Sequence, residues 1–467
     1  MRHEFRYRWI AITLASVLVL TVVAIQIHLN KKALPHVSLG HNADTSVNTD
    51  ITGVGSYGTY CTSNGEVVSD GIDTKYEIFL NIICNAVRSG SNVVHYSELT
   101  LANLHKDQMA PTKLTIWGGI NAFEGLYGRR METTLLSGPE HETIADALDG
   151  HYGCVFVLNY HTGEVPIMLS VPSGRPDNSQ KQEEEGESDG RMTNRNLYSR
   201  EPGSTIKIVA ALCALTQDPE LANFTYTCTG RHPLPNKTVI PCQSAHGSQT
   251  MSDAIGNSCN CYFTALIEQF DVGETRSILK GLDFDLEENL NTRQYLDLIP
   301  YEQGFISFSN NRTNTQITKL IGLGGSEVSM IDMTRIAAAI VNGGSCAKPH
   351  IVRSIYDPNT EAYTYQAGEP EMISMVDPDA AETLSEIWNK AVEDYYYAKT
   401  VPLDPSISHA KTGTDETSAN MEDNNRFILA VMEEYNIAFM VSVEDSYDET
   451  VYRVANTVAQ VIVEANR

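Results

Sequence analysis

The chain has 467 residues, a length that suits two or three domains at most. Its apolar fraction of 42% and charged fraction of 20% are ordinary for a globular protein and exclude wholesale disorder and collagen-like repeats. Lys and Arg number 33 against 59 Asp and Glu, and the net charge of −26 disfavours binding of nucleic acid through a broad basic surface.

The N-terminal region carries a long apolar segment. Residues 9–29 contain no Asp, Glu, Lys or Arg, and a helix of that length crosses a hydrocarbon core of about 30 Å. Arg2, Arg6 and Arg8 precede it, so the positive-inside rule places residues 1–8 in the cytoplasm and the rest of the chain outside. A cleaved signal peptide is the alternative, but it has a shorter apolar region and a small-residue cleavage site. We therefore predict a single-pass anchor in the cell membrane.

Three regions of different character follow the anchor. Residues 30–52 are polar and rich in Asn, Thr and Asp, which is typical of a linker. Residues 53–132 mix short strand-like and helical pieces with many glycines and are predicted to form a small N-terminal module. From residue 133 to residue 467 the apolar residues recur with clear strand and helix periodicity, which predicts one large domain. An acidic, solvated loop at 177–189 interrupts it.

The large domain begins and ends with strand patterns. Two β-rich runs, 153–159 and 164–171, are separated by a short turn and predict an antiparallel hairpin. Residues 203–400 are mainly helical in pattern. Three strand patterns and a final amphipathic helix follow, at 406–414, 426–433, 436–444 and 449–467. The expected fold class is α/β (α+β), with one antiparallel sheet built from N- and C-terminal strands and flanked by helices.

The nine cysteines give no clear metal or redox motif. No Cys-x-x-Cys pair occurs, so a zinc ribbon or a thioredoxin-like site has little support. Cys228 and Cys242 bracket a stretch rich in Pro and Gly and are compatible either with a disulfide or with two small buried thiols. The sequence leaves both alternatives open.

A serine and a lysine stand three residues apart at the start of an apolar helix. At that spacing the side chains of Ser204 and Lys207 share one face. A serine hydroxyl needs a base, and a lysine serves as one when desolvation and nearby positive charge keep it neutral. The alternative is a helix-capping serine beside a solvated lysine, which the Pro-Gly lead-in and the apolar continuation make less suitable.

Ser258 and Asn260 form a second short motif. If the segment is a tight turn between helices, the hydroxyl and the amide project into one cleft, where the first relays a proton and the second holds a carbonyl. A simple helix cap is the alternative for this triplet.

The third motif is the run Lys411, Thr412, Gly413 and Thr414 on a predicted strand. It offers a cation and hydroxyl donors to a carboxylate, and the glycine lets a ligand backbone approach the strand edge. An exposed edge strand is the alternative.

In this order, S-x-x-K, S-x-N and K-T-G are the signature set of penicillin-binding proteins and serine β-lactamases. Over about residues 133–465 the chain resembles a penicillin-binding protein with a class B-like, monofunctional transpeptidase domain. The segments around the first hairpin, the Ser204 region and the Ser258 region add to that resemblance.

The resemblance implies D,D-transpeptidation in peptidoglycan synthesis through a serine acyl-enzyme. It implies three kinds of role: catalysis, substrate binding, and stabilisation of the oxyanion by two backbone N–H groups. The catalytic residues would be Ser204, Lys207, Ser258 and Lys411. The substrate-binding residues would be Asn260, Thr412, Gly413 and Thr414. The oxyanion hole would be formed by the N–H groups of Ser204 and Thr414.

The resemblance also implies the ligands and partners. These are peptidoglycan stem peptides, β-lactam antibiotics, the membrane through the N-terminal helix and a membrane glycan polymerase, with no nucleic acid, metal or organic cofactor. Two residues depart from the family pattern. Ala410 stands where many relatives have Gly, and Asp415 adds negative charge beside the carboxylate site.

Two other functions are compatible with the same motifs. One is hydrolysis of the acyl-enzyme, as in a D,D-carboxypeptidase or a β-lactamase-like protein. The other is a non-catalytic β-lactam sensor or a scaffold of the cell-wall machinery, although its motifs would be expected to be degraded and all three are intact here.

Overall fold

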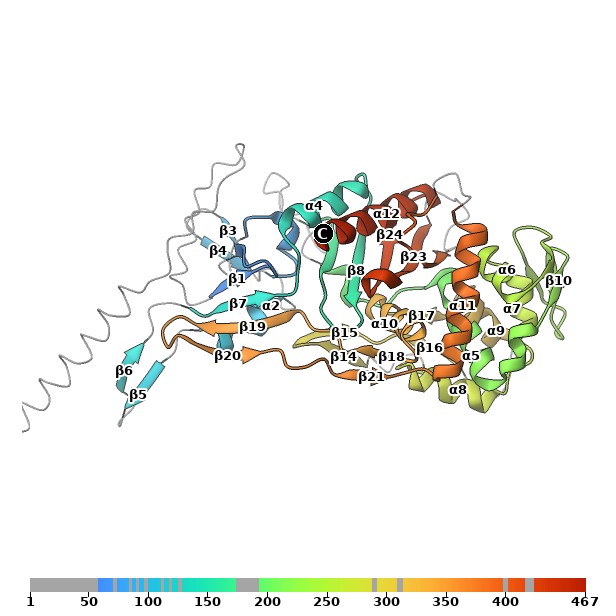
Figure 1. The fold of residues 1–467 in the computed structure, drawn as a ribbon, viewed down its shortest axis with the longest axis horizontal. Helices are drawn as coiled ribbons and strands as arrows, with labels where there is room; N and C mark the ends of the chain where they lie inside the picture. Colours follow the sequence, from blue (N-terminus) through green and yellow to red (C-terminus); the bar gives the residue numbers. More distant parts are fainter. Residues whose placement is uncertain are drawn as a thin grey trace, which may run out of the picture. The chain divides into compact units, whose positions relative to one another are not determined.

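A computed structural model gives the fold, and it divides into two compact units (Figure 1). The larger unit consists of residues 77–82, 134–351 and 368–467, and the smaller unit takes the described residues up to 76 together with 83–133 and 352–367. The structure describes residues 58–69, 74–83, 86–89, 92–95, 100–110, 113–116, 120–124, 128–173, 193–287, 292–308, 314–397, 402–415 and 424–467.

Four predicted segments lie outside the described residues. They are the cytoplasmic tail (1–8), the anchor (9–29), the linker (30–52) and the acidic loop (177–189). Within the described ranges, no helix has both the length and the apolar character needed to cross a bilayer.

A five-stranded antiparallel sheet forms the centre of the larger unit. The order is β22-β23-β24-β8-β9, so strands from both ends of the domain share one sheet, as the sequence predicts. Apart from the edge strand β22, these runs are rich in Val, Ile, Leu, Phe and Met, which suit a pleated surface covered on both faces. The bounds are His409–Asp415, Asn425–Met432, Ile437–Val443, Gly153–Asn159 and Ile167–Val171, respectively.

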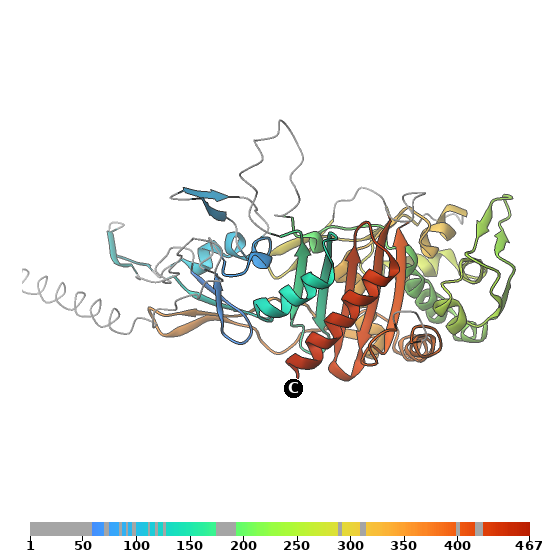
Figure 2. The ribbon, with the colours of Figure 1, turned by 90° about the horizontal axis from the view of Figure 1, so that it is seen from above.

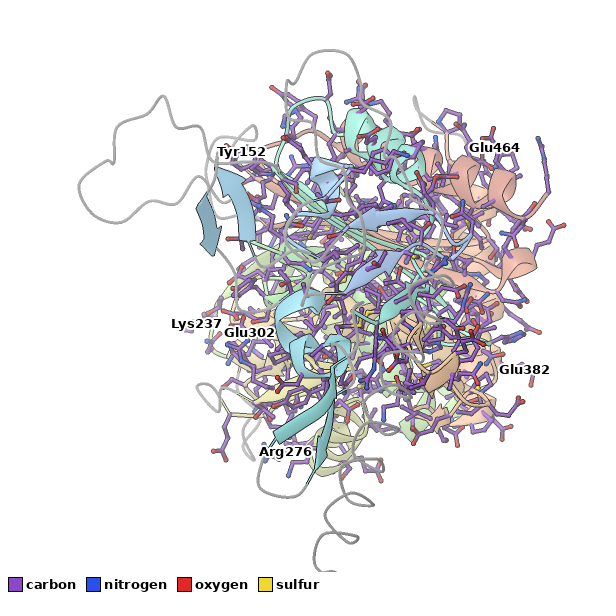
Figure 3. The ribbon with its side chains drawn as sticks, turned by 90° about the vertical axis from the view of Figure 1, so that its left-hand side faces the viewer. Tyr152, Lys237, Arg276, Glu302, Glu382 and Glu464 are labelled. Atoms are coloured by element: carbon purple, nitrogen blue, oxygen red, sulfur yellow. The ribbon has the colours of Figure 1, made fainter. Side chains whose placement is uncertain are left out.

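Helices cover both faces of this sheet (Figures 1 and 2). α4 (Gly138–Ala147) and α12 (Asp448–Ala465) contact each other on one face, and α10 (Met330–Val341) packs on the other against β8, β23 and β24. The acidic side chains of Glu382 on α11 and Glu464 on α12 lie on the outside (Figure 3) and are exposed.

The predicted helical region forms a bundle beside β22. At its centre is α5 (Lys207–Gln217), which is buried along most of its length and contacts α7, α8, α9 and α11. Its run of Ile, Val, Ala and Leu explains why it is apolar on every side. The other helices of the bundle are α6 (Met251–Gly256), α7 (Asn260–Ile267), α8 (Val272–Gly281), α9 (Asn314–Ile321) and α11 (Pro378–Tyr395).

A segment of very short strands, residues 226–249, interrupts this bundle between α5 and α6. β10 (Tyr226–Cys228) pairs with β13 (Gly247–Gln249), and β11 (Arg231–Pro233) pairs with β12 (Val239–Pro241). The remaining strands of the larger unit form two-stranded antiparallel pairs. β14 (Arg293–Leu296) and β15 (Ile299–Glu302) form a hairpin, whereas β16 (Phe305–Ile306) pairs with β17 (Ser326–Glu327) and β18 (Ser345–Ala347) with β21 (Met372–Ser374) across longer stretches of chain.

The smaller unit has its own sheet, in the order β2-β1-β7-β19-β20. β7 (Arg130–Thr133) lies between β1 (Thr59–Cys61), which is parallel to it, and β19 (Val352–Asp357), which is antiparallel. Residues 352–366 return to this unit, which the sequence does not predict. Its other elements are β2 (Val67–Ser69), β3 (Ala86–Ser89), β4 (Asn92–His95), β5 (Lys113–Ile116), β6 (Ile120–Glu124), β20 (Ala362–Gln366), α2 (Leu101–Leu104) and α3 (Lys106–Met109).

Candidate active site

The three sequence motifs meet at the turn that carries Ser204. This residue lies in the 3-10 turn η3 (Gly203–Ile206), which leads directly into α5 and contacts β22. Gly203 has a φ of +50°, and a Cβ at this position would lie 2.3 Å from the carbonyl oxygen of Thr414. Only glycine therefore lets the turn approach the edge strand this closely.

The amine of Lys207 lies within hydrogen-bond distance of the Ser204 hydroxyl. Its Nζ lies 2.7 Å from Ser204 Oγ and donates to the carbonyl oxygen of Ser258 at 3.0 Å and to Asn260 Oδ1 at 2.6 Å. Lys207 has no exposed surface. An amine removed from water and held beside a hydroxyl is the arrangement that serine activation requires.

Ser258 occupies a strained turn between two helices. Its φ is +51°, a conformation that costs a non-glycine residue about 1–3 kcal/mol. It lies between α6 and α7, as the motif predicts for a tight turn. Asn260 Nδ2 donates to the carbonyl oxygen of Pro241 at 3.0 Å, and this contact orients the amide so that Oδ1 faces Lys207.

Lys411 completes the polar centre from β22. Its Nζ lies 3.0 Å from Ser258 Oγ and 2.8 Å from the carbonyl oxygen of Thr412, and the residue is fully buried. Because Lys207 Nζ lies 3.2 Å from the same hydroxyl, Ser258 Oγ bridges the two amines. A proton can therefore pass from one amine to the other through a single hydroxyl.

Gly413 lets the edge strand lie against the nucleophile turn. A Cβ there would lie 2.6 Å from the carbonyl oxygen of Pro202 and 3.0 Å from Thr205 Cγ2. β22 is the last strand of its sheet, and the neighbouring Thr412 and Thr414 are partly exposed. The predicted site residues thus form one constellation, in which the two lysines are buried and the hydroxyl and amide groups remain accessible.

One residue of this constellation was missed by the sequence analysis. Tyr396, which follows α11, is buried, and its hydroxyl accepts the backbone N–H of Thr412 at 3.2 Å and lies 3.4 Å from Thr412 Oγ1. Burial raises the pKa of this tyrosine, so it stays neutral. No sequence signal distinguishes it, because it is the middle member of a run of three tyrosines at the end of a helix.

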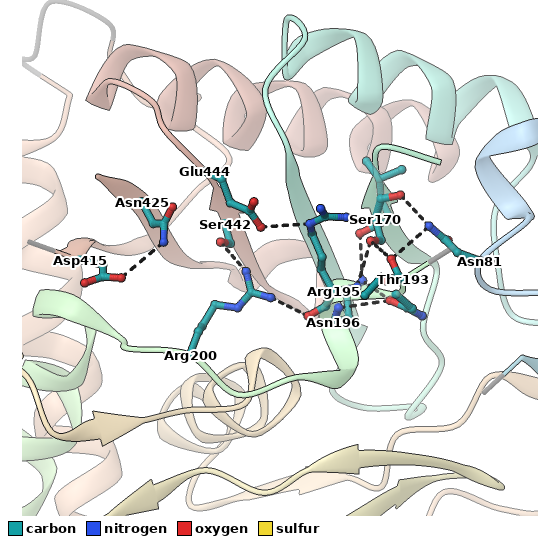
Figure 4. A network of polar contacts seen from close by, with 12 residues as sticks. Asn81, Ser170, Thr193, Arg195, Asn196, Arg200, Asp415, Asn425, Ser442 and Glu444 are labelled. Carbon is teal, nitrogen blue, oxygen red and sulfur yellow. Dashed lines mark hydrogen bonds and ion pairs between the residues drawn. The ribbon is translucent and has the colours of Figure 1, made fainter. Parts of the chain in front are cut away.

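Two carboxyl groups flank the nucleophile turn. Asp415 follows Thr414, and burial together with the negative charge of Glu201 raises its pKa to about 6. Asn425 Nδ2 lies 3.4 Å from Asp415 Oδ2 (Figure 4) and opposes that shift. The departure from the family pattern noted at Asp415 therefore lies next to a proposed oxyanion donor.

An arginine fixes the chain just before the nucleophile turn (Figure 4). The guanidinium of Arg200 donates to Ser442 Oγ at 2.9 Å and to the carbonyl oxygen of Arg195 at 2.7 Å. Its backbone exchanges hydrogen bonds of 3.0 and 2.7 Å with Val328. The residues leading to Ser204 are therefore attached to β24 and to the start of α10, which limits the freedom of the nucleophile.

Residues 153–464 match the sequence model of the penicillin-binding protein transpeptidase domain. The chain belongs to this family. The match covers the central sheet, the helical bundle and all three motifs, and therefore most of the larger unit.

Curated relatives show the same similarity over part of their length. The chain is 24% identical to the peptidoglycan D,D-transpeptidase PbpA of Mycolicibacterium smegmatis over 325 residues, which are 63% of this chain and 62% of the relative. It is 28% identical to the stage V sporulation protein D of Bacillus subtilis over 211 residues, 44% of this chain and 30% of the relative. The chain thus spans less than two thirds of the length of either relative.

Solved structures share the fold. PBPA from Mycobacterium tuberculosis superposes with a TM-score of 0.66 at 20% identity, covering 88% of this chain and 99% of that structure. The D,D-transpeptidase domain of a peptidoglycan glycosyltransferase from Eggerthella lenta gives a TM-score of 0.68 at 17% identity, covering 88% and 98%.

Proposed function

We propose that this penicillin-binding transpeptidase is a peptidoglycan D,D-transpeptidase that acts through an acyl-enzyme on Ser204. The observation that carries the proposal is the 2.7 Å distance between Lys207 Nζ and Ser204 Oγ, with Ser258 Oγ bridging Lys207 to Lys411. This geometry gives the nucleophile both a base and a path for its proton.

The proposal requires Lys207 to act as the base in its neutral form. The Ser258 carbonyl and Asn260 Oδ1 are acceptors that can take its two N–H groups, and the lone pair can then be directed to one of the two hydroxyl oxygens, Ser204 Oγ at 2.7 Å or Ser258 Oγ at 3.2 Å. When it is directed to Ser204 Oγ, it accepts the serine proton. A positive charge on Lys411, one hydroxyl away, disfavours a second positive charge at Lys207.

In the acylation half-reaction, Ser204 Oγ attacks the carbonyl carbon between the two terminal D-alanines of a stem peptide. Its proton moves to Lys207 while the carbonyl becomes an oxyanion, which the backbone N–H groups of Ser204 and Thr414 stabilise. The C–N bond then breaks, and the proton reaches the departing amine of D-alanine by way of Ser258. An ester on Ser204 and a free D-alanine result.

In the second half-reaction an amine of a neighbouring strand attacks the ester carbonyl. The amine loses its proton to the same relay, Ser204 Oγ takes a proton back as the ester C–O bond breaks, and a new amide forms the cross-link. Asn260, Thr412 and Thr414, which are partly exposed, would hold the substrate together with Gly413, the buried residue between the two threonines.

The same proposal includes the location and partners of the enzyme. Residues 9–29 would anchor the chain, with residues 1–8 in the cytoplasm, residues 53–132 as a reduced pedestal-like module and residues 133–467 outside the membrane. A membrane glycan polymerase would supply the strands to be cross-linked.

The experiment is covalent labelling of the full-length protein in detergent by a fluorescent penicillin. Wild type should be labelled, Ser204→Ala should not, and Ser277→Ala, which changes an exposed serine on α8, should be labelled like wild type. Label on Ser204→Ala, or no label on folded wild type, would contradict the proposal and favour the scaffold alternative.

Product analysis then distinguishes transfer from hydrolysis. A stem peptide that ends in D-alanyl-D-alanine is incubated with the enzyme and an acceptor amine, and we expect the new amide. Release of D-alanine with only the shortened peptide would contradict transpeptidation and indicate a D,D-carboxypeptidase.

A further inference from the structure

Four metal-ligating side chains converge beside the catalytic turn and take no part in the reaction described above. They are Cys228, Cys242, His246 and Cys259, and their ligand atoms all lie within 4.8 Å of one another. They come from the end of β10, the residue after β12, the loop before β13 and the residue that caps α7. Cys228 and Cys259 are buried, whereas Cys242 and His246 are partly exposed.

Three of the six distances between ligand atoms in this cluster are close to those around one shared ion, and the others are at most 4.8 Å. In a tetrahedral zinc site with Zn–S bonds of about 2.3 Å and Zn–N bonds of about 2.0–2.1 Å, two sulfurs lie about 3.8 Å apart and a sulfur and a nitrogen about 3.5 Å apart. Cys242 Sγ lies 3.8 Å from Cys259 Sγ and 3.5 Å from His246 Nδ1, and Cys228 Sγ lies 3.7 Å from the same nitrogen. A disulfide needs about 2.0 Å, and all three cysteines are free thiols.

We propose that Cys228, Cys242, His246 and Cys259 form a structural Zn²⁺ site of the Cys₃His type. Four protein ligands close the coordination sphere, which is the property of a structural rather than a catalytic zinc. On binding, each thiol releases its proton to solvent as its Zn–S bond forms, and the imidazole binds through Nδ1. The disulfide between Cys228 and Cys242, one of the two alternatives in the sequence, does not form in this arrangement.

The segment that carries three of the ligands packs on α6 and α7 but has little apolar packing of its own. Residues 226–249 form two-stranded pieces of three residues per strand, and in β11 and β12 only the central residue is buried. Such pieces do not bury enough apolar surface to be stable alone, and small units of this kind commonly rely on a metal or on disulfides. The ion would supply that stability.

The proposed site is joined to the catalytic centre by the chain itself. Cys259 is the residue between Ser258 and Asn260, and its Sγ accepts the backbone N–H of Tyr262 at 3.4 Å. Cys242 follows Pro241, whose carbonyl oxygen orients the amide of Asn260. A zinc ion that holds Cys242 and Cys259 together would therefore fix both sides of the turn that carries the proton relay.

The site forms no recognisable motif in the sequence because its ligands are widely spaced. Thirteen residues separate Cys228 from Cys242, and twelve separate His246 from Cys259. Only the Cys-x₃-His pair at 242 and 246 is local, and the expectation that no metal is needed rested on the lack of a Cys-x-x-Cys motif and on the family resemblance.

The experiment measures bound metal in the full-length protein, purified in detergent without chelators. Elemental analysis should find stoichiometric zinc in wild type and in Cys346→Ser, a control that changes a buried thiol outside the cluster. His246→Ala and Cys228→Ser should lose the zinc. Extraction of wild type with a zinc chelator should lower the unfolding temperature and slow labelling by fluorescent penicillin several-fold, and added Zn²⁺ should restore both.

Three results would overturn the proposal. Wild type that neither contains zinc nor takes up added Zn²⁺ is one, and equal zinc in wild type and His246→Ala is another. The third is a thiol count in which the cluster cysteines are oxidised to disulfides. If Cys228→Ser fails to fold, His246→Ala and the chelation of wild type still decide. Zinc content is read without any substrate, so its outcome is separate from that of the proposed transpeptidation.

Discussion

Two regions of the larger unit hold the catalytic groups in different ways. β24 is buried at every residue and β23 at all but its first, so this part of the sheet is rigid by apolar packing. Segment 226–249 buries few residues. It contacts the catalytic site through the carbonyl oxygen of Pro241 and through the proposed zinc ligands, in which Cys242 lies beside Cys259. The nucleophile and Lys411 are thus positioned by the core. Ser258 and Asn260 are held by the buried helices α6 and α7 on one side and by polar links to segment 226–249 on the other.

The largest effect is expected from the loss of the buried amine of Lys207 at the start of α5. Lys207→Met keeps the aliphatic volume but removes the base from Ser204, so we expect the rate of acylation to fall by at least about 100-fold. The measurement is the second-order rate of labelling by fluorescent penicillin, with unfolding followed in parallel. Lys237→Met, at an exposed turn of segment 226–249, is the control. Labelling of Lys207→Met at the wild-type rate would exclude Lys207 as the base.

Matched truncations test the difference in packing directly. Phe156→Ala in β8 removes a fully buried ring from the sheet and should lower the free energy of unfolding by about 3–5 kcal/mol. Ile240→Ala in β12 should cost about 2 kcal/mol or less, because a loosely packed surrounding can collapse around the gap. Urea unfolding gives both values. Equal losses would show that the two regions do not differ in the way proposed.

Gly203→Ala tests the close approach between the nucleophile turn and β22. The new Cβ would meet the Thr414 carbonyl at 2.3 Å, and the residue would keep a positive φ, so we expect a loss of about 1–3 kcal/mol in stability and slower acylation. Gly281→Ala at the end of α8 meets nothing within 4 Å and should change stability by less than about 1 kcal/mol. Wild-type stability and a wild-type rate of acylation in Gly203→Ala would contradict the close contact between Gly203 and the Thr414 carbonyl.

The smallest effect is expected at Asp415. Its pKa is raised to about 6 in the folded protein, so the folded state binds more protons than the unfolded chain between about pH 4 and pH 6. Stability from this group is therefore present at low pH and is lost as the pH rises through 6. Asp415→Asn should equal wild type at about pH 4 and exceed its stability at pH 7 by about 1 kcal/mol or less.

Thermal unfolding across this pH range measures the effect, with Asp379→Asn on the exposed start of α11 as the control. The same variant should acylate faster than wild type above pH 6, because a charged Asp415 repels the carboxylate of the antibiotic. A difference in stability that shrinks as the pH rises would contradict this assignment.

Much of the fold follows from local patterns in the sequence. The strands and the long helices of the larger unit bury continuous or periodic apolar runs, so their type and order could be predicted, and the order of the three motifs placed them on one helix start, one turn and one edge strand. The hairpin of β8 and β9 was also predicted, although β9 begins at Ile167 rather than at residue 164.

The features that could not be predicted depend on long-range contacts. Tyr396 reaches Thr412 across sixteen positions of chain, and nothing in its own neighbourhood selects it from Tyr395 or Tyr397. Asp415 was noted only as an unusual residue, because its raised pKa arises from burial and from Glu201, which is far away in sequence. The four proposed zinc ligands are likewise far apart in the sequence, except for Cys242 and His246.

The arrangement of β7 bears on how the smaller unit can be made during translation. One neighbour, β1, precedes it in the chain, but the other, β19, begins more than two hundred positions later. Until that later stretch has left the ribosome, the nascent sheet presents an open edge, which is a template for wrong pairing. Completion of this small sheet must therefore wait for synthesis of most of the larger unit, which ties the maturation of the two in time.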